Sequence, residues 1–93
     1  MAERLSPEAI EEAMKRIPEW ELEESSISRT FEFEEYMDGI GFVNKVAAAA
    51  EEANHHPDME VRYGWVDVSL STHDAEGLTD LDFDLAQKID SLG

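Results

Sequence analysis

All three histidines of the chain lie within two short polar motifs. The motifs are Glu51-x-x-x-His55-His56-Pro57 and Ser71-Thr72-His73. Imidazole gains and loses a proton near neutral pH, so histidine is the usual proton donor and acceptor in catalysis. Carboxylates and hydroxyls flank the three rings, and Asp82 follows further along. The pattern predicts a site that transfers protons.

The expected positions of the histidines favour a shared pocket. His55 and His56 directly follow a predicted helix over residues 39–53, and Pro57 prevents its continuation. A helix C-terminus carries partial negative charge, so protonated imidazole is favoured there. His73 follows a predicted strand. If the helix end and the strand end meet over one sheet edge, the rings suit acid/base elimination or hydration chemistry.

Two other interpretations remain open from the residues alone, and a third is disfavoured. Adjacent histidines at a helix end often serve only as capping or surface residues. A zinc site of three histidines and Asp82 is a second option, although neighbouring helical residues diverge by about 100° and no H-x-H or H-x-x-x-H spacing exists. Serine-hydrolase chemistry would need a G-x-S-x-G turn, which the sequence lacks.

Two further residues have both a structural and a functional interpretation. Asp82 falls on the inward seam of the predicted last helix, where a carboxylate needs a partner. It completes a capping arrangement three residues after Thr79, or it orients one of the histidines. Trp20 is either ordinary core or an aromatic surface that stacks on a planar heterocycle.

Composition limits the class of protein. A chain of 93 residues, 42% of them hydrophobic, suffices for a single domain over residues 1–93 with one core. There is no cysteine, which excludes disulfides, thiolate metal sites and a cysteine nucleophile. The longest aliphatic run, residues 46–50, is too short for a membrane span, and the start resembles no secretion signal. We therefore expect a cytoplasmic protein.

The charge is strongly negative. The chain has 23 acidic and 7 basic residues, a net charge of −16. Such a field repels nucleic acid and anionic membranes, so neither is expected as a partner. It suits a salt-rich cytoplasm, where self-repulsion is screened. A halophilic source is our hypothesis, with a melting temperature that rises steeply with potassium chloride.

Hydrophobic periodicity predicts the elements that position the site. In order they are a helix from Pro7, capped by Ser6 and stopped by Pro18; strands over 20–23 and 27–34; a helix over 39–53; strands over 59–63 and 65–72; and a helix opened by Thr79. This α-β-β-α-β-β-α order predicts a two-layer α+β domain, an antiparallel sheet with helices on one face. The alanine-rich middle helix and the exposed strand edges favour a homodimer or homotetramer.

The spacing of the motifs resembles that of a known family. Glu51-x3-His55-His56-Pro57-x5-Tyr63-x9-His73-x8-Asp82 is similar to the signature of the pterin-4a-carbinolamine dehydratases. The resemblance extends from Trp20-Glu21-Leu22 through Arg29-x-Phe31-x-Phe33 to Asp82-x-x-Leu85-Ala86. It implies a four-stranded antiparallel sheet with three helices on one side. It also implies dehydration of 4a-hydroxytetrahydropterin to quinonoid dihydropterin, which recycles the pterin of aromatic amino-acid hydroxylases without a metal or another cofactor.

The resemblance implies a role for each site residue. Of the three catalytic histidines, His55 and His73 would donate protons to the leaving 4a-hydroxyl, and His56 would chiefly hold the pterin. The other residues would line the site (Asn54, Ser71, Thr72 and Asp74), support it (Glu51 and Asp82) or flank it (Trp20). Animal members also act as dimerisation cofactors of a homeodomain transcription factor. The alternative function is therefore a non-catalytic dimerisation or coregulator module of the same fold.

Overall fold

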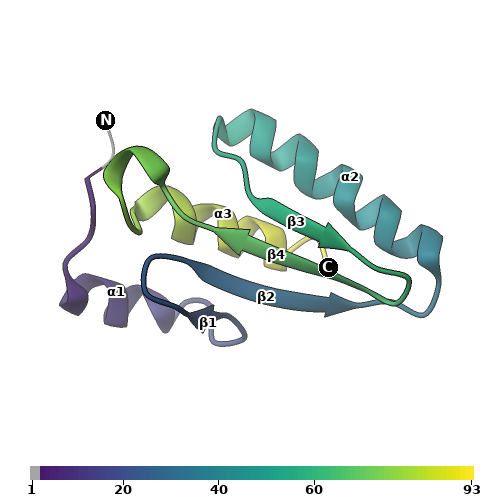
Figure 1. The fold of residues 1–93 in the computed structure, drawn as a ribbon, viewed down its shortest axis with the longest axis horizontal. Coiled ribbons are helices and arrows are strands. Elements are labelled where there is room, and N and C mark those ends of the chain that lie inside the picture. Colours follow the sequence, from purple (N-terminus) through teal and green to yellow (C-terminus); the bar gives the residue numbers. More distant parts are fainter. Residues whose placement is uncertain (1–2) are drawn as a thin grey trace.

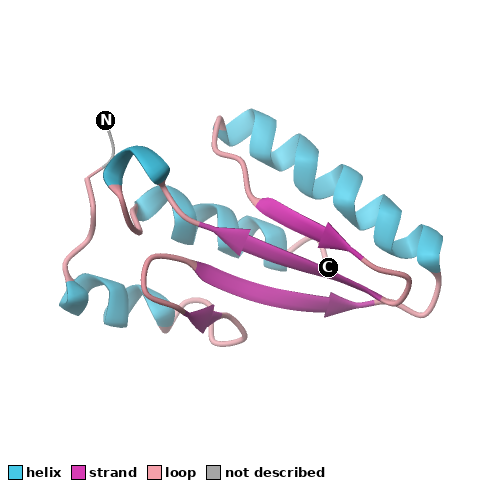
Figure 2. Ribbon diagram, viewed as in Figure 1, coloured by secondary structure: helices cyan, strands magenta, loops and turns pink. Residues whose placement is uncertain are grey.

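The computed structural model describes residues 3–93 of the chain (Figures 1 and 2). The elements are α1 (Pro7–Met14), β1 (Glu21–Leu22), β2 (Ile27–Glu32), α2 (Tyr36–Ala53), β3 (Asp58–Val61), β4 (Trp65–Leu70), a 3₁₀ helix (His73–Ala75) and α3 (Asp80–Asp90). This order confirms the predicted α-β-β-α-β-β-α arrangement.

The four strands form one antiparallel sheet in the order β1-β2-β4-β3. Cross-strand partners share a face, so the register Phe31↔Val66 and Ile27↔Leu70 places these four side chains on one side. All four are buried against the helices. The opposite face carries polar residues and is left uncovered by helices, as Figure 1 shows. The predicted two-layer α+β fold is therefore confirmed.

The first helix is shorter than predicted. Ser6 caps it as expected, because its Oγ accepts a hydrogen bond from the Ala9 N–H at 3.1 Å. The α-helix ends at Met14, and the next turn has i→i−3 bonds, such as Ile17 N–H to Met14 O at 3.1 Å. Pro18 disfavours α-helical geometry at the residue before it, which explains the tighter last turn.

The middle helix, α2, begins at Tyr36 rather than at the predicted Gly39. Glycine is a poor helix former, so two glycines in the first turns hide the true start from a propensity argument. Phe42, Val46 and Ala50 are buried, whereas Ala47 and Ala48 are exposed. Thus α2 buries a narrower stripe than its composition suggests.

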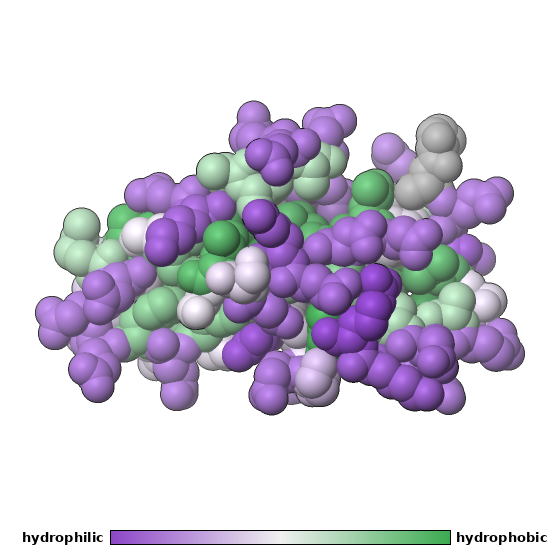
Figure 3. Space-filling view, turned by 180° about the vertical axis from the view of Figure 1, so that it is seen from behind, coloured by the Kyte–Doolittle hydropathy of each residue, from purple (hydrophilic) through white to green (hydrophobic). Residues whose placement is uncertain are grey.

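The core lies between the sheet and the helices and draws on every helix and on both long strands. The outside is largely hydrophilic: seen from behind, polar side chains surround smaller hydrophobic areas (Figure 3). None of the helices within residues 3–93 combines the length and hydropathy that a membrane span requires.

Candidate active site

The end of α2 and the 3₁₀ helix that follows β4 lie at the same end of the sheet (Figure 1). A hollow of about 240 Å³ opens between them. Its lining residues come from two segments far apart in the sequence: Asn54, His55 and His56 after α2, and Ser71, Thr72, His73 and Asp74 after β4. These seven are the residues that the resemblance assigns to the substrate site, and the structure brings all of them together.

Asn54 redirects the chain at the end of α2. It has left-handed backbone angles, φ 52° and ψ 41°. Asparagine tolerates this conformation better than most residues, so the turn itself explains why an asparagine stands here. The turn ends the helix, with the His55 N–H bonded to the Ala50 carbonyl at 3.1 Å. As a result His55 is buried while its neighbour His56 is exposed.

The other wall is formed where the chain leaves β4. Thr72 and Gly77 form an isolated bridge, with Thr72 N–H donating to the Gly77 carbonyl at 3.0 Å. The bridge closes a short loop that contains the 3₁₀ helix and His73. This loop returns the chain to α3, so the strand end, His73 and the start of α3 lie around the same site.

A buried pair joins the two walls. His55 Nε2 lies 2.6 Å from Asp82 Oδ1, and the side chains are only 10% and 0% exposed. The other oxygen, Asp82 Oδ2, accepts hydrogen bonds from Thr72 Oγ1 at 2.8 Å and from the Thr79 N–H at 2.9 Å. Asp82 therefore completes the capping box of α3 and holds a histidine at the same time.

The other two histidines are more exposed. His56 Nε2 lies 2.5 Å from Glu51 Oε2, and these side chains are 56% and 77% exposed. His73 is exposed in the 3₁₀ helix, and its ring has no hydrogen-bond partner among residues 3–93. The hollow thus combines one fixed imidazole with two that solvent reaches freely.

The structure places Trp20 away from this hollow. Trp20 is 4% exposed, its Nε1 donates to Asp90 Oδ1 at 2.8 Å, and its ring meets Phe31 edge-on. Its contacts are those of a core residue, the structural interpretation of this tryptophan. Tyr63, another residue of the motif, lies in the β3–β4 turn, where it stacks on Tyr36.

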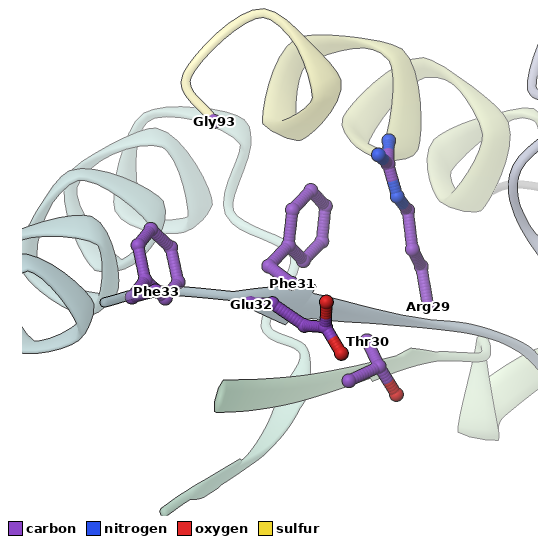
Figure 4. A pocket seen from close by; sticks show the side chains of 6 residues that line it. All are labelled: Arg29, Thr30, Phe31, Glu32, Phe33 and Gly93. Carbon is purple, nitrogen blue, oxygen red and sulfur yellow. The ribbon is translucent and has the colours of Figure 1, made fainter. Parts of the chain in front are cut away.

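A second hollow, of about 350 Å³, lies beside β2 (Figure 4). Figure 4 shows the rings of Phe31 and Phe33 on its helix side, with Thr30 and Glu32 on the other face of the strand. The Arg29 guanidinium is bound to Asp90 at 2.7 Å. In this second hollow the Arg29 cation is already paired, and no histidine lines the hollow. We therefore assign the candidate active site to the first hollow, which three histidines line.

The histidines are not arranged as a metal centre. Within residues 3–93, no group of three or more histidine, aspartate or glutamate side chains could hold a metal ion. His55 and His56 are instead paired with separate carboxylates. Imidazole is a side chain that can transfer protons, and two of the three rings contact a carboxylate.

Fold and site together define a small α+β protein with a histidine-lined hollow at one end of its sheet. A sequence model of the family described as Pterin 4 alpha carbinolamine dehydratase matches residues 3–92. A protein of Acidobacterium capsulatum that is named as a pterin-4-alpha-carbinolamine dehydratase is 49% identical over 89 residues, covering 96% of this chain and 97% of that protein. A Haloarcula marismortui protein with the same name is 45% identical over 93 residues, covering 99% and 98%. The chain therefore belongs to the pterin-4-alpha-carbinolamine dehydratase family, a family of hydro-lyases.

Solved structures support the fold. A transcriptional coactivator/pterin dehydratase from Brucella melitensis superimposes with a TM-score of 0.91 at 33% identity, over 96% of this chain and 97% of that one. A pterin dehydratase-like protein identified as a RuBisCO assembly factor in the alpha-carboxysome has a TM-score of 0.65 at 20% identity, over 78% and 84%. The second likeness concerns the fold alone.

Proposed function

We propose that this protein dehydrates a 4a-hydroxytetrahydropterin to a quinonoid dihydropterin by histidine acid/base catalysis. The substrate class follows from the family. The observation that carries the chemistry is the buried His55–Asp82 pair in the wall of a hollow that also contains His56 and His73. An aspartate in this position stabilises an imidazolium, which is the acid that the reaction needs.

The proposed reaction is an elimination of water. The lone pair of the ring nitrogen next to C4a forms a C=N bond while the C4a–O bond breaks. A protonated imidazole gives its proton to the departing oxygen, so that water leaves rather than hydroxide. The hydrogen on the ring nitrogen is then lost to a neutral imidazole. General acid catalysis of this kind is worth roughly 10²–10⁴-fold.

We assign roles by position in the hollow. His55 and His73 stand on opposite walls and are the proposed proton donors, one bound to Asp82 and one exposed to solvent. His56, held by Glu51 at the rim, is proposed chiefly to bind the pterin. The remaining lining residues offer hydrogen-bonding groups to the ring edge: Asn54, Ser71, Thr72 and Asp74.

The proposal extends to assembly and compartment. We propose a single catalytic domain that forms a homodimer or homotetramer in the cytoplasm. The exposed alanines Ala47 and Ala48 on α2 and the free edge of β3 are the surfaces that support self-association. The compartment rests on composition, namely the acidic surface and the lack of cysteine.

One observation favours the alternative of a coregulator module. The Brucella melitensis protein carries both names, transcriptional coactivator and pterin dehydratase. If the module function applied here, variants without the histidines would keep their full biological effect.

A stopped-flow dehydration assay in high salt tests the proposal. The absorbance of 4a-hydroxytetrahydropterin should decay faster with the protein, and His55→Ala and His73→Ala should each lower kcat by about 10²-fold or more. His56→Ala should act mainly on KM. Met37→Ala, an exposed change in the first turn of α2, is the matched control and should leave the rate unchanged. No acceleration by the wild type with any pterin would reject the enzyme in favour of the module.

A further inference from the structure

We propose that Thr79 is a positioning residue for this reaction, acting through Thr72 and Asp82 on His55. Together they fix the His55 ring with its hydrogen on Nε2, which makes Nδ1 the atom that gives and takes the proton. The proposal deepens the function proposed above and rests on it for the identity of the reaction. The placement of the protons rests on the contacts alone.

The first step is the count of donors around Asp82. An ionised carboxylate can only accept hydrogen bonds. Oδ1 is 2.6 Å from His55 Nε2, and Oδ2 is within 2.9 Å of both the Thr79 N–H and the Thr72 hydroxyl. All three partners must therefore donate. His55 carries a hydrogen on Nε2, and the single hydroxyl hydrogen of Thr72 points to Asp82.

The second step assigns the hydroxyl of Thr79. Thr72 Oγ1 and Thr79 Oγ1 are 2.8 Å apart, so one of them donates to the other. Because the Thr72 hydrogen is already used, the donor is Thr79. The Thr79 oxygen in turn accepts from the Leu81 N–H at 3.2 Å. The result is a one-way chain, from Thr79 to Thr72 to Asp82, with His55 donating to the same carboxylate.

Burial makes this order unique. Thr79 and Asp82 are fully buried and Thr72 is 8% exposed, so bulk water does not compete for these bonds. Hydrogen bonds in such a chain also strengthen one another in a medium of low dielectric constant. Asp82 lies in the first turn of α3, where the helix dipole stabilises its negative charge. We therefore assign the carboxylate as the acceptor and His55 Nε2–H as the donor of the hydrogen bond between them.

The third step identifies the working nitrogen. Among residues 3–93, no fully buried side-chain nitrogen or oxygen lacks a partner. His55 Nε2 is used by Asp82, and the other ring nitrogen, Nδ1, has no hydrogen-bond partner among residues 3–93, so it is at least partly open to solvent. His55 lines the hollow, and we infer that its open nitrogen, Nδ1, is the atom that a bound molecule meets there. In the reaction Nδ1–H passes its proton to the departing oxygen. The neutral imidazole that remains still carries its hydrogen on Nε2 and still donates it in a hydrogen bond to Asp82.

The alternative is that Thr79 only caps α3, and the chain offers a matched control for it. Ser6 caps α1 with a hydrogen bond of similar length, 3.1 Å, and makes no hydrogen bond to Thr79, Thr72 or Asp82 within residues 3–93. Ser6→Ala therefore measures what the loss of a cap does by itself. Thr79→Ser keeps both the cap and the hydroxyl chain, whereas Thr79→Val removes both at nearly constant volume. Thr72→Ala removes the middle hydroxyl and leaves the cap in place.

The experiment is ¹⁵N NMR of histidine side chains, with the His55 signals identified by His55→Gln, combined with steady-state kinetics. In the wild type and in Thr79→Ser, neutral His55 should carry its hydrogen on Nε2. Thr79→Val and Thr72→Ala loosen the hold on Asp82, so its carboxylate can turn away from Nε2, and His55 should then show a mixture of both tautomers. Thr79→Val should lower kcat by about tenfold, the equivalent of one hydrogen bond, at nearly constant KM. Ser6→Ala should change neither tautomer nor kcat.

Several results would overturn the proposal. One is a wild-type His55 that carries its hydrogen on Nδ1. Another is Thr79→Val with the wild-type tautomer and the wild-type kcat, which would reduce Thr79 to a cap. If Thr79→Val does not fold, the tautomers of His55 in Thr72→Ala and in the wild type decide the question. A wild-type tautomer in Thr72→Ala would then overturn the proposal. The spectra need no pterin, so an inactive wild type with the Nε2–H tautomer would reject the proposed function and leave the hydrogen-bond chain standing.

Discussion

The candidate site contains two histidine–carboxylate pairs that are alike in contact and opposite in surroundings. His55 and Asp82 are 2.6 Å apart with side chains 10% and 0% exposed. His56 and Glu51 are 2.5 Å apart with side chains 56% and 77% exposed. Nearly equal distances therefore coexist with very different solvent screening. The two pairs therefore differ in burial and in the additional hydrogen bonds to the carboxylate, and not in the distance between histidine and carboxylate.

The two carboxylates also differ in their position on a helix. Asp82 lies in the first turn of α3, where the helix dipole favours a negative charge, and it accepts three hydrogen bonds. Glu51 lies near the C-terminus of α2, where the dipole opposes a negative charge. His56 offsets that cost only when it is protonated. The Asp82 carboxylate is thus held in place by three hydrogen bonds and the helix dipole. The Glu51 carboxylate is stabilised by its contact with His56.

The largest expected effect comes from breaking the buried pair. Asp82→Ala removes the N3 carboxylate of the capping box and leaves Thr72 and Thr79 without their acceptor. We expect it to lower the free energy of unfolding by about 3–5 kcal/mol. Glu51→Ala, the matched change in the exposed pair, should cost less than about 1 kcal/mol. Urea denaturation of both variants in the same buffer measures the difference.

A similar loss for the two variants would remove the distinction between the pairs. If Asp82→Ala is too unstable for a full urea curve, Asp82→Asn keeps the volume and part of the hydrogen bonding. The Asn variant should still be less stable than Glu51→Gln.

The next effect concerns the exposed charge as a whole. With a net charge of −16, much of the surface repels itself, and salt screens that repulsion. Each kcal/mol of repulsion removed should raise the melting temperature by about 4–8 °C for a domain of this size. We expect at least such a rise between low and molar potassium chloride, measured by thermal unfolding. A flat response would end the halophile hypothesis.

The sequence predicted the elements well and the network poorly. Hydrophobic periodicity was enough to predict the strands, because a strand has a strict period of two and its buried face carries residues such as Ile27, Phe31 and Val66. The position of Asp82 on the inward seam of α3 indicated that it needed a partner. It did not show that capping and histidine binding occur together, since that depends on Thr72 crossing from the other wall. The start of α2 was missed because Gly39 masks it.

A third prediction compares Asp82 with the carboxylate at the other end of α3. Asp90 lies where the helix dipole is unfavourable, and it is held by Arg29 at 2.7 Å and by the Trp20 N–H at 2.8 Å. Trp20→Phe removes one of these bonds and should cost about 1 kcal/mol of unfolding free energy. Because Trp20 lies in the core, kcat should stay at its wild-type value. A loss of activity at unchanged stability would instead place Trp20 beside the pterin.

The smallest expected effect sharpens the comparison most. A double-mutant cycle with His56→Ala and Glu51→Ala, measured by urea denaturation at low salt and neutral pH, should give a coupling of about 0.2–1 kcal/mol. Molar potassium chloride should abolish it, because both side chains are more than half exposed and the Debye length falls to about 3 Å. The cycle with His55→Ala and Asp82→Asn should keep its coupling in the same salt, because these side chains are buried. Equal salt sensitivity of the two couplings would mean that water reaches Asp82, and the contrast between the pairs would then be lost.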